Sequence, residues 1–253
     1  MDPAPFDQFA QGLRSLRDGT DALAAVDVQH ARDRLSEQIR SGDVSLLDLQ
    51  LGFEPDFVYN FPFGEEPLYA QLGRFQGGLL ALNDAMISYA DLLARLAGNE
   101  VVNQVTFDQL TTDLNANALR AANALDLGIG GDDSALLSTV AVTAFRGVIE
   151  SKRRAGLAGA IKDVQPQMAE FSNKMVVAIK FLATGVTTDY DDQFRAIVGP
   201  VAAAGGAPID DAVIEKVLTL NLRTQETLGT LSALSASYRR LPAAHEDLIK
   251  AAG

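Results

Sequence analysis

The most constraining feature of the chain is an apolar stripe over residues 68–96. Its members are spaced alternately by four and three residues: Leu68, Leu72, Phe75, Leu79, Leu82, Met86, Tyr89, Leu93 and Leu96. This spacing keeps one side of a helix apolar for about eight turns and is typical of helices that pack along their whole length. Pro67 fits the first turn of such a helix, and Gly98 fits its carboxyl end. The stripe predicts one long amphipathic helix over 68–96.

Comparable stripes predict further helices on both sides of this one. The first changes phase near its middle, and Gly42 is placed to end it. The sequence TFDQ at 106–109 matches a capping box, whereas Pro166 and Pro242 favour helix boundaries. The expected helices are, in chain order, 5–40, 68–96, 106–125, 134–163, one from Pro166 to about 186 or 198, 209–240, and a short one after Pro242.

Long helices joined by short loops imply antiparallel neighbours. We therefore expect an all-α fold, an antiparallel up-and-down helical bundle of about five to seven helices with long coiled-coil-like helices. A single all-helical domain is expected over 1–253, with an irregular aromatic-rich segment at 41–66 and a Gly/Ala/Pro loop at 199–208. Whether the helices form a compact bundle or an extended rod stays open.

The composition narrows the classes of partner. Hydrophobic residues make up 47% and charged residues 21%, which is ordinary for a globular chain. With 21 basic and 33 acidic residues the net charge is -12, and this acidic excess disfavours nucleic acid and anionic lipid surfaces as partners. No run approaches the roughly 20 apolar residues that a membrane-spanning helix needs.

Groups suited to catalysis or metal binding are scarce. The chain has no Cys, so it has no disulfide, no thiolate metal ligand and no cysteine nucleophile. His30 and His245 are the only histidines, and for both we expect a surface or capping role on a helix. No GxSxG elbow, paired Glu-x-x-His motif or EF-hand loop is present. We therefore expect a protein that is not an enzyme and that holds no cofactor or metal, although a hydrolase using two carboxylates stays open.

Aromatic residues concentrate in the segment FEPDFVYNFPFGEEP at 53–67. Of the 17 aromatic residues in the chain (12 Phe and 5 Tyr), five fall within 53–63. Four of them alternate, which in an extended backbone places their side chains on one side: Phe57, Tyr59, Phe61 and Phe63. Two interpretations stay open. The segment is either a plug that closes the bundle core, or a lid or docking surface held by a rigid scaffold.

Three glycines interrupt the predicted helix over 68–96, each at a cost of roughly 1 kcal/mol relative to Ala. Gly73, Gly77 and Gly78 allow either the close approach of a neighbouring helix or a wall thinned for a ligand beside Phe75 and Leu79. The predicted ligand- or partner-binding residues are therefore Phe57, Tyr59, Phe61, Phe63, Phe75 and Leu79.

In the general character of its sequence the chain resembles the uncharacterised all-helical lipoproteins of proteobacterial cell envelopes. The similarity lies in the tether DPAP, the run YADLLARLAG, the stretch ESKRRAGLAGAIKDVQP and the ending YRRLPAAHEDL. The resemblance implies a periplasmic protein, free or anchored to the outer membrane, whose lipidated Cys precedes Asp2. The start MDPAPFDQFA lacks the regions of a signal peptide, so an export signal would have been removed. The cytoplasm stays open as an alternative location.

These observations lead to two functional hypotheses. The first is a non-catalytic interaction protein that offers a long helical face, or its aromatic-covered end, to another envelope protein. The second is a carrier that holds a lipid or other apolar molecule between helices, beneath the aromatic residues of 53–63.

Overall fold

The protein is an all-helical bundle in the computed structural model, which describes residues 2–53, 59–62, 64–98, 112, 154–203 and 209–252. Its elements over these residues are α1 (Ala4–Ser41), a short 3-10 helix (Leu46–Leu49), strands β1 (Gly52–Phe53) and β2 (Tyr59–Asn60), α2 (Leu68–Ala97), α5 (Arg154–Ala203) and α6 (Asp211–Ala252). The all-α prediction is therefore confirmed. The described part contains four α-helices, fewer than the five to seven expected. The expected helix over 106–125 lies almost wholly outside it, as do residues 134–153 of the expected helix over 134–163.

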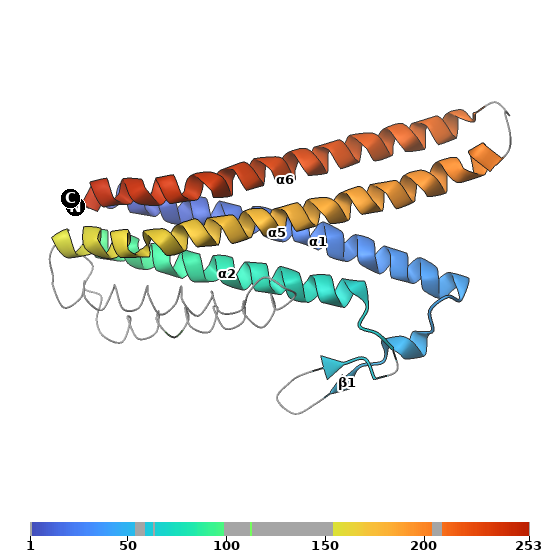
Figure 1. Ribbon diagram of the computed structural model, residues 1–253, viewed down its shortest axis with the longest axis horizontal. Coiled ribbons are helices and arrows are strands. Elements are labelled where there is room, and N and C mark those ends of the chain that lie inside the picture. Colours follow the sequence, from blue (N-terminus) through green and yellow to red (C-terminus); the bar gives the residue numbers. More distant parts are fainter. Residues whose placement is uncertain are drawn as a thin grey trace.

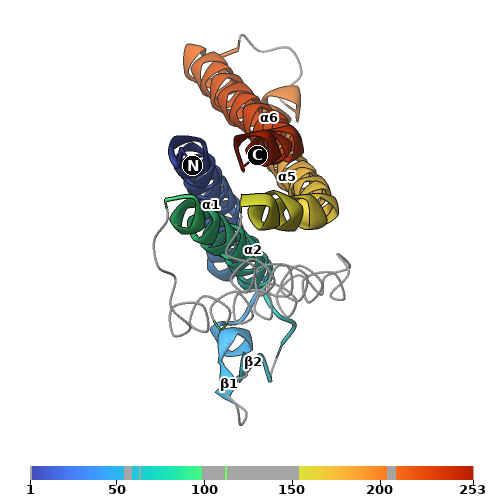
Figure 2. The same ribbon diagram turned by 90° about the vertical axis from the view of Figure 1, so that its left-hand side faces the viewer.

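The four helices form two antiparallel pairs. Helix α1 packs along α2, and α5 packs along α6, with far fewer contacts between the pairs than within them. Figure 1 shows the pairs diverging toward the end at which α5 leads to α6, whereas the two chain termini lie together at the other end. Seen along the bundle, α2 and α6 lie on opposite sides, with α1 and α5 between them (Figure 2). Helices α1 and α6 therefore lie side by side but contact each other less extensively than the helices within each pair do.

The predicted stripe of α2 forms the centre of the core. The expected bounds 68–96 match Leu68–Ala97, and Phe75, Leu79, Leu82, Met86, Tyr89 and Leu93 are buried. They pack with buried residues of the other helices, which include Phe6, Leu13, Met168, Phe171, Ile179 and Tyr238. Because the chain's own helices cover this stripe, it does not offer the long free face that the first hypothesis required.

Two predicted helix boundaries at proline are wrong. Pro166 lies inside α5 and Pro242 lies inside α6, so the sequence 154–203 is one helix and 211–252 is another. A proline inside a helix costs roughly 3 kcal/mol. That cost is offset because apolar side chains are buried on both sides of each proline, at about 1.5 to 3 kcal/mol each; these residues are Ile161, Val164, Met168, Leu241 and Leu248. The expected loop at 199–208 likewise begins later, since α5 continues through Pro200 to Ala203.

The end of α1 follows the prediction from Gly42. Its backbone is left-handed (φ 85°), a conformation that glycine adopts without a steric penalty. The N–H groups of Gly42, Asp43 and Val44 donate to the carbonyls of Ile39 and Gln38, which satisfies the last turn of the helix.

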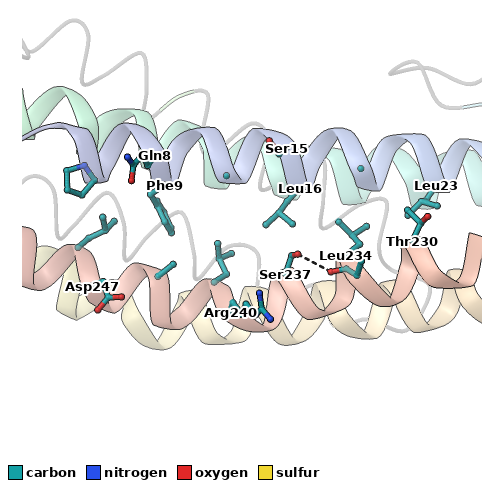
Figure 3. A pocket seen from close by; sticks show the side chains of 17 residues that line it. Gln8, Phe9, Ser15, Leu16, Leu23, Thr230, Leu234, Ser237, Arg240 and Asp247 are labelled. Carbon is teal, nitrogen blue, oxygen red and sulfur yellow. Dashed lines mark hydrogen bonds between the residues drawn. The ribbon is translucent and has the colours of Figure 1, made fainter.

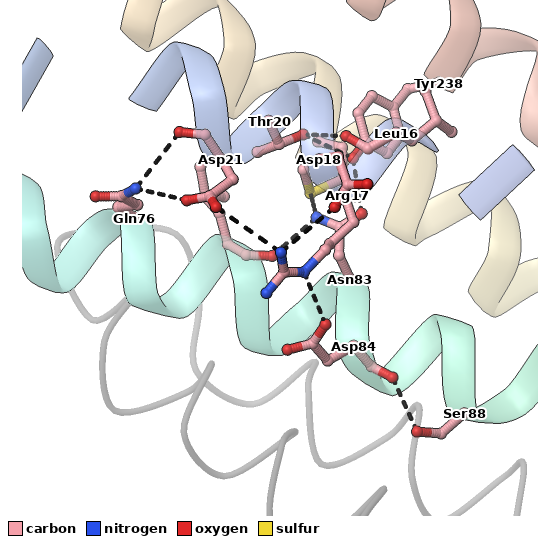
Figure 4. Close-up of polar contacts among 12 residues, drawn as sticks. Leu16, Arg17, Asp18, Thr20, Asp21, Gln76, Asn83, Asp84, Ser88 and Tyr238 are labelled. Atoms are coloured by element: carbon pink, nitrogen blue, oxygen red, sulfur yellow. Dashed lines mark hydrogen bonds and ion pairs between the residues drawn. The ribbon is translucent and has the colours of Figure 1, made fainter. Parts of the chain in front are cut away.

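Side-chain bonds tie α1 to α2 along their outer edge. Arg17 Nε donates to Asp84 Oδ1 (3.1 Å), and Gln76 Nε2 donates to Asp21 Oδ1 (2.8 Å), as Figure 4 shows. Arg14 pairs with Asp91 further along the same edge. These pairs are partly exposed, so each contributes little to stability, but together they fix the register of the two helices.

The glycines inside the helices divide into two kinds. A Cβ built at Gly73 or Gly77 of α2 would meet no atom within 4 Å, so neither glycine is there for the close approach of another helix. Gly185 of α5 differs, because a Cβ there would lie 3.1 Å from Asp27 Oδ2.

Gly73→Ala and Gly77→Ala should each raise the free energy of unfolding by about 0.5 to 1 kcal/mol, because alanine restricts the unfolded chain and fits the open space. Gly185→Ala is the matched control and should lower it, because its methyl group crowds the Asp27 carboxyl. Urea unfolding followed by circular dichroism measures all three. Equal effects at the three positions would contradict this account of the packing.

Candidate functional site

A large hollow along the bundle is the groove between α1 and α6, which we call the α1/α6 groove. It has a volume of about 720 Å³, and its walls come from residues 5–23 of α1 and 230–248 of α6. Figure 3 shows the two helices side by side, with side chains from both pointing into the space between them. The large apolar residues that line it are Phe9, Leu16, Leu23, Leu234, Leu241 and Leu248.

The groove follows from a regular alternation of large and small residues. On both helices the large residues recur every seven positions, as in one of the two core positions of a heptad repeat. The other core position is small throughout, at Gly12 and Gly19 on α1 and at Thr230, Ser237 and Ala244 on α6. A coiled-coil seam closes when both positions carry large side chains, so this alternation leaves the seam half filled.

The two glycines of α1 have different neighbours. A Cβ at Gly12 would meet nothing within 4 Å, whereas a Cβ at Gly19 would lie 3.3 Å from Leu234 Cδ1. Packing therefore does not require glycine at position 12. Glycine is nevertheless present there, at a cost of about 1 kcal/mol in helix propensity relative to alanine. Gly12 keeps the groove open.

Behind Phe9, the groove wall is backed by a buried chain of hydrogen bonds. The rings of Phe9 and His245 are 5.8 Å apart, and His245 is fully buried. Tyr89 Oη lies 2.6 Å from His245 Nε2, and His245 Nδ1 lies 2.5 Å from Gln165 Oε1. Gln165 Nε2 in turn donates to the carbonyl of Pro242 (2.9 Å). The carbonyl oxygen of Gln165 can only accept, so Nδ1 carries the proton and Tyr89 donates to Nε2.

His245 is therefore a neutral structural group at pH 7. Burial lowers the pKa of His245 to about 4, and burial also raises the pKa of Tyr89. Because both ring nitrogens already have partners, the ring has no free nitrogen with which to act on a ligand. The expected surface or capping role of His245 is wrong, since the residue is buried in the interior of α6.

A second buried network joins α1, α2 and α6 near the middle of the bundle. Tyr238 Oη donates to Asn83 Oδ1 (2.7 Å) and lies 2.9 Å from Thr20 Oγ1 (Figure 4). Asn83 Nδ2 donates to the carbonyl of Leu79 (2.9 Å), so both ends of its amide are bonded. Burial raises the pKa of Tyr238 to about 12, so this network is uncharged at pH 7.

A third group of polar residues, the Asp27 cluster, lies between α1, α5 and α6 and comprises Asp27, His30, Arg34, Asp189 and Arg223. Asp27 and Asp189 are 7% and 6% exposed. His30 Nδ1 lies 3.1 Å from Asp189 Oδ2, though off the direction of a ring hydrogen bond, and Arg223 donates to His30 Nε2 (3.1 Å). Burial and the charge of Asp189 raise the pKa of Asp27 to about 7, while Arg34 opposes that rise. Among the described residues, no three His, Asp or Glu side chains are placed to hold a metal ion.

Of the predicted binding residues whose surroundings the structure describes, Phe61 lies apart from Phe75 and Leu79. Phe75 and Leu79 are buried in the core, at 2% and 1% exposure, and Phe75 packs against Phe181. Tyr59 belongs to β2, whereas the predictions for Phe57 and Phe63 lie outside the described residues. Phe61 is half-buried and lines a second groove.

This second hollow, which we call the Phe61 groove, has a volume of about 550 Å³ and lies between α1 and the start of α2. Its lining combines apolar and basic residues: Val28, Arg32, Leu51, Phe61, Tyr69, Ala70, Gly73 and Arg74. Gly73 faces open space here, which favours the thinned-wall interpretation at that position. Arg74 forms an ion pair with Glu66, so the charge of one of the two arginines that line the groove is neutralised.

The α1/α6 groove was not found from the sequence, although its signal is present there. Phe9, Gly12, Leu16, Gly19 and Leu23 are spaced by three and four residues with every second member glycine. That pattern indicates only a plain amphipathic helix until α6, with the same alternation, is known to lie opposite.

Comparison with known proteins adds no assignment, since no protein-family model, curated protein or solved structure matches the chain. Of the helices that the structure describes, none is both long and apolar enough to cross a membrane.

Asp27→Asn should stabilise the protein at pH 8 by about 1 to 3 kcal/mol, because an amide avoids the cost of a buried charge. The pKa of Asp27 is about 7 in the folded state against 3.8 unfolded, so its contribution to stability falls as pH rises through this range. The gain should therefore shrink as the pH falls below 7 and nearly disappear at about pH 3.5, where the carboxyl is protonated in both states. Thermal unfolding of wild type and variant at both pH values measures it.

Asp33→Asn is the control for this measurement, since Asp33 is exposed on the same helix. It should change stability little at either pH. An Asp27→Asn protein that is no more stable than wild type at pH 8 would show that Asp27 is not held in a charge-excluding environment.

Proposed function

We propose that the chain is a non-catalytic helical-bundle binding protein of the bacterial cell envelope, and that it holds an elongated apolar ligand in the α1/α6 groove. The observation that supports this most directly is the groove itself. Its volume of about 720 Å³ falls in the range of roughly 300 to 1,000 Å³ typical of small-molecule sites. Its lining is mainly Leu, Phe, Ala and Gly, with a few polar side chains.

The shape of the groove favours a long ligand. Residues 5–23 of α1 extend over roughly 27 Å at 1.5 Å per residue, and the groove follows the helix over that length. The large apolar residues recur at every second turn along both walls, so the apolar surface is continuous and not gathered in one compact pocket. An extended alkyl chain fits such a surface better than a globular ligand does.

The surroundings of the groove support binding without chemistry. His245, a titratable group directly behind its wall, is neutral and has both nitrogens bonded. Asp247 at the groove pairs with Lys250 (2.6 Å). A general acid or base needs a free proton site that reaches the ligand, and neither group supplies one.

The envelope location rests on the resemblance to proteobacterial lipoproteins and is part of the proposal. A periplasmic protein that shields an apolar molecule from water is consistent with a bundle that carries a long, largely apolar groove. A lipid anchor before Asp2 would be tested by mass spectrometry of the protein purified from its own host.

Three matched glycine substitutions test the proposal. Positions 12, 73 and 229 each have no atom within 4 Å of a built Cβ, and they lie in the α1/α6 groove, in the Phe61 groove and in neither. Gly12→Leu should weaken binding of the neutral fluorescent probe N-phenyl-1-naphthylamine at least tenfold, because the new side chain fills the groove. Gly229→Leu should leave the affinity unchanged, and circular dichroism should show equal helicity.

A second candidate site for the same function is the Phe61 groove, because Phe61 and Gly73 both line it. This corresponds to a carrier with its ligand beneath the aromatic segment. If Gly73→Leu abolishes probe binding and Gly12→Leu does not, the ligand lies there and the proposal for the α1/α6 groove is wrong.

A protein partner is the second candidate function, favoured by one exposed face of α6. Ile214, Leu218 and Leu222 are 44%, 57% and 59% exposed and recur every four residues. Light scattering with and without Leu218→Lys tests for association through this face, and a monomer in both cases would count against it.

A further inference from the structure

We infer that the ligand of the α1/α6 groove is a long-chain carboxylate whose head group is bound by Arg240. This inference rests on the proposed function and names the chemistry of its ligand. Arg240 lines the groove, and Figure 3 shows it between Asp247 on one side and Leu234 on the other. It therefore lies along the groove and not at its end.

Arg240 is the uncompensated charge of the groove. It has no ion-pair partner among the described residues, and the residues three and four positions away on α6 are all uncharged: Ala236, Ser237, Ala243 and Ala244. The other ionic residue of the lining, Asp247, is paired with Lys250 at 2.6 Å. The groove consequently presents one net positive charge, within a chain whose formal net charge is -12.

The serine hydroxyls of the lining are less suited to a head group. Ser15 Oγ donates to the carbonyl of Gln11 (3.2 Å), and Ser237 Oγ donates to the carbonyl of Ala233 (2.9 Å). Each hydroxyl has a single proton to donate, so these two are occupied by their own helices. The guanidinium of Arg240, with its planar fork of N–H donors, is free to take a carboxylate with two parallel bonds.

The apolar surface beside Arg240 fits the tail of such a ligand. From position 240 to position 230 the groove extends roughly 15 Å along α6 at 1.5 Å per residue. Leu234, Leu16 and Leu23 line this part of it. A single carboxylate also matches the single cation, whereas a dianionic phosphate would leave one negative charge without a partner.

The test compares two neighbouring arginines. Arg239 and Arg240 are both exposed on α6, but only Arg240 lines the groove. Displacement of N-phenyl-1-naphthylamine by dodecanoic acid and by dodecanol is measured for wild type, Arg240→Gln and Arg239→Gln. We expect Arg240→Gln to weaken dodecanoate about tenfold while dodecanol is unchanged, and Arg239→Gln to change neither. Both variants should keep the melting temperature of wild type, since neither arginine makes an ion pair in the described residues.

Failure of this inference is distinguishable from failure of the proposed function. If Gly12→Leu abolishes probe binding but Arg240→Gln leaves dodecanoate as strong as before, the groove binds apolar ligands without recognising a carboxylate, and the inference is overturned. If wild type binds neither probe nor acid, the proposed function itself fails. Flotation with phosphatidylglycerol vesicles tests whether Arg240 binds a membrane lipid instead of a free carboxylate. Binding to vesicles that is lost in Arg240→Gln but not in Arg239→Gln, without competition by dodecanoate, would assign Arg240 to a membrane head group and overturn the inference.

Discussion

The bundle depends on two tyrosines that cross its core between α2 and α6, the helices that lie on opposite sides. Tyr89 of α2 donates to His245 of α6, and Tyr238 of α6 donates to Asn83 of α2. Both side chains are almost fully buried, at 1% and 0% exposure. A buried donor left without its partner costs about 1 to 3 kcal/mol, so each bond disfavours any other register of the two helices. The pair of bonds thereby sets how far apart the two helix pairs lie.

That separation explains why a groove remains beside α1. Large Leu and Phe side chains line the gap at every seventh residue, whereas Gly12 and Ser237 between them leave it open. Filling position 12 with a large side chain would help to close the seam and add stability, as in an ordinary coiled coil. The chain instead keeps glycine there, and no packing contact requires it. A residue that lowers the stability of the fold, and that no packing contact requires, is typical of a position that serves a function.

Sequence patterns predicted the elements whose signals are local. The bounds of α1 and α2, the cap at Gly42 and the helical class follow from periodicity and turn chemistry, and they agree with the structure. The helix boundaries predicted at Pro166 and Pro242 were wrong because proline disfavours a helix only locally. Burial of apolar side chains on both sides of each proline stabilises a continuous helix. The burial of His245 and the α1/α6 groove depend on which helices become neighbours. A single helix carries the large and small alternation, but only the pairing of α1 with α6 turns that alternation into a hollow.

The most direct test of the central claim is to locate a bound alkyl chain. A fatty acid carrying a photoreactive diazirine at its terminal carbon would be irradiated in complex with the wild-type protein, and the adducts would be mapped by mass spectrometry. The account predicts adducts on the walls of the α1/α6 groove, at residues such as Leu16, Leu23 and Leu234. Adducts at Val28 and Tyr69 in the Phe61 groove, or labelling no stronger than that of unfolded protein, would contradict it.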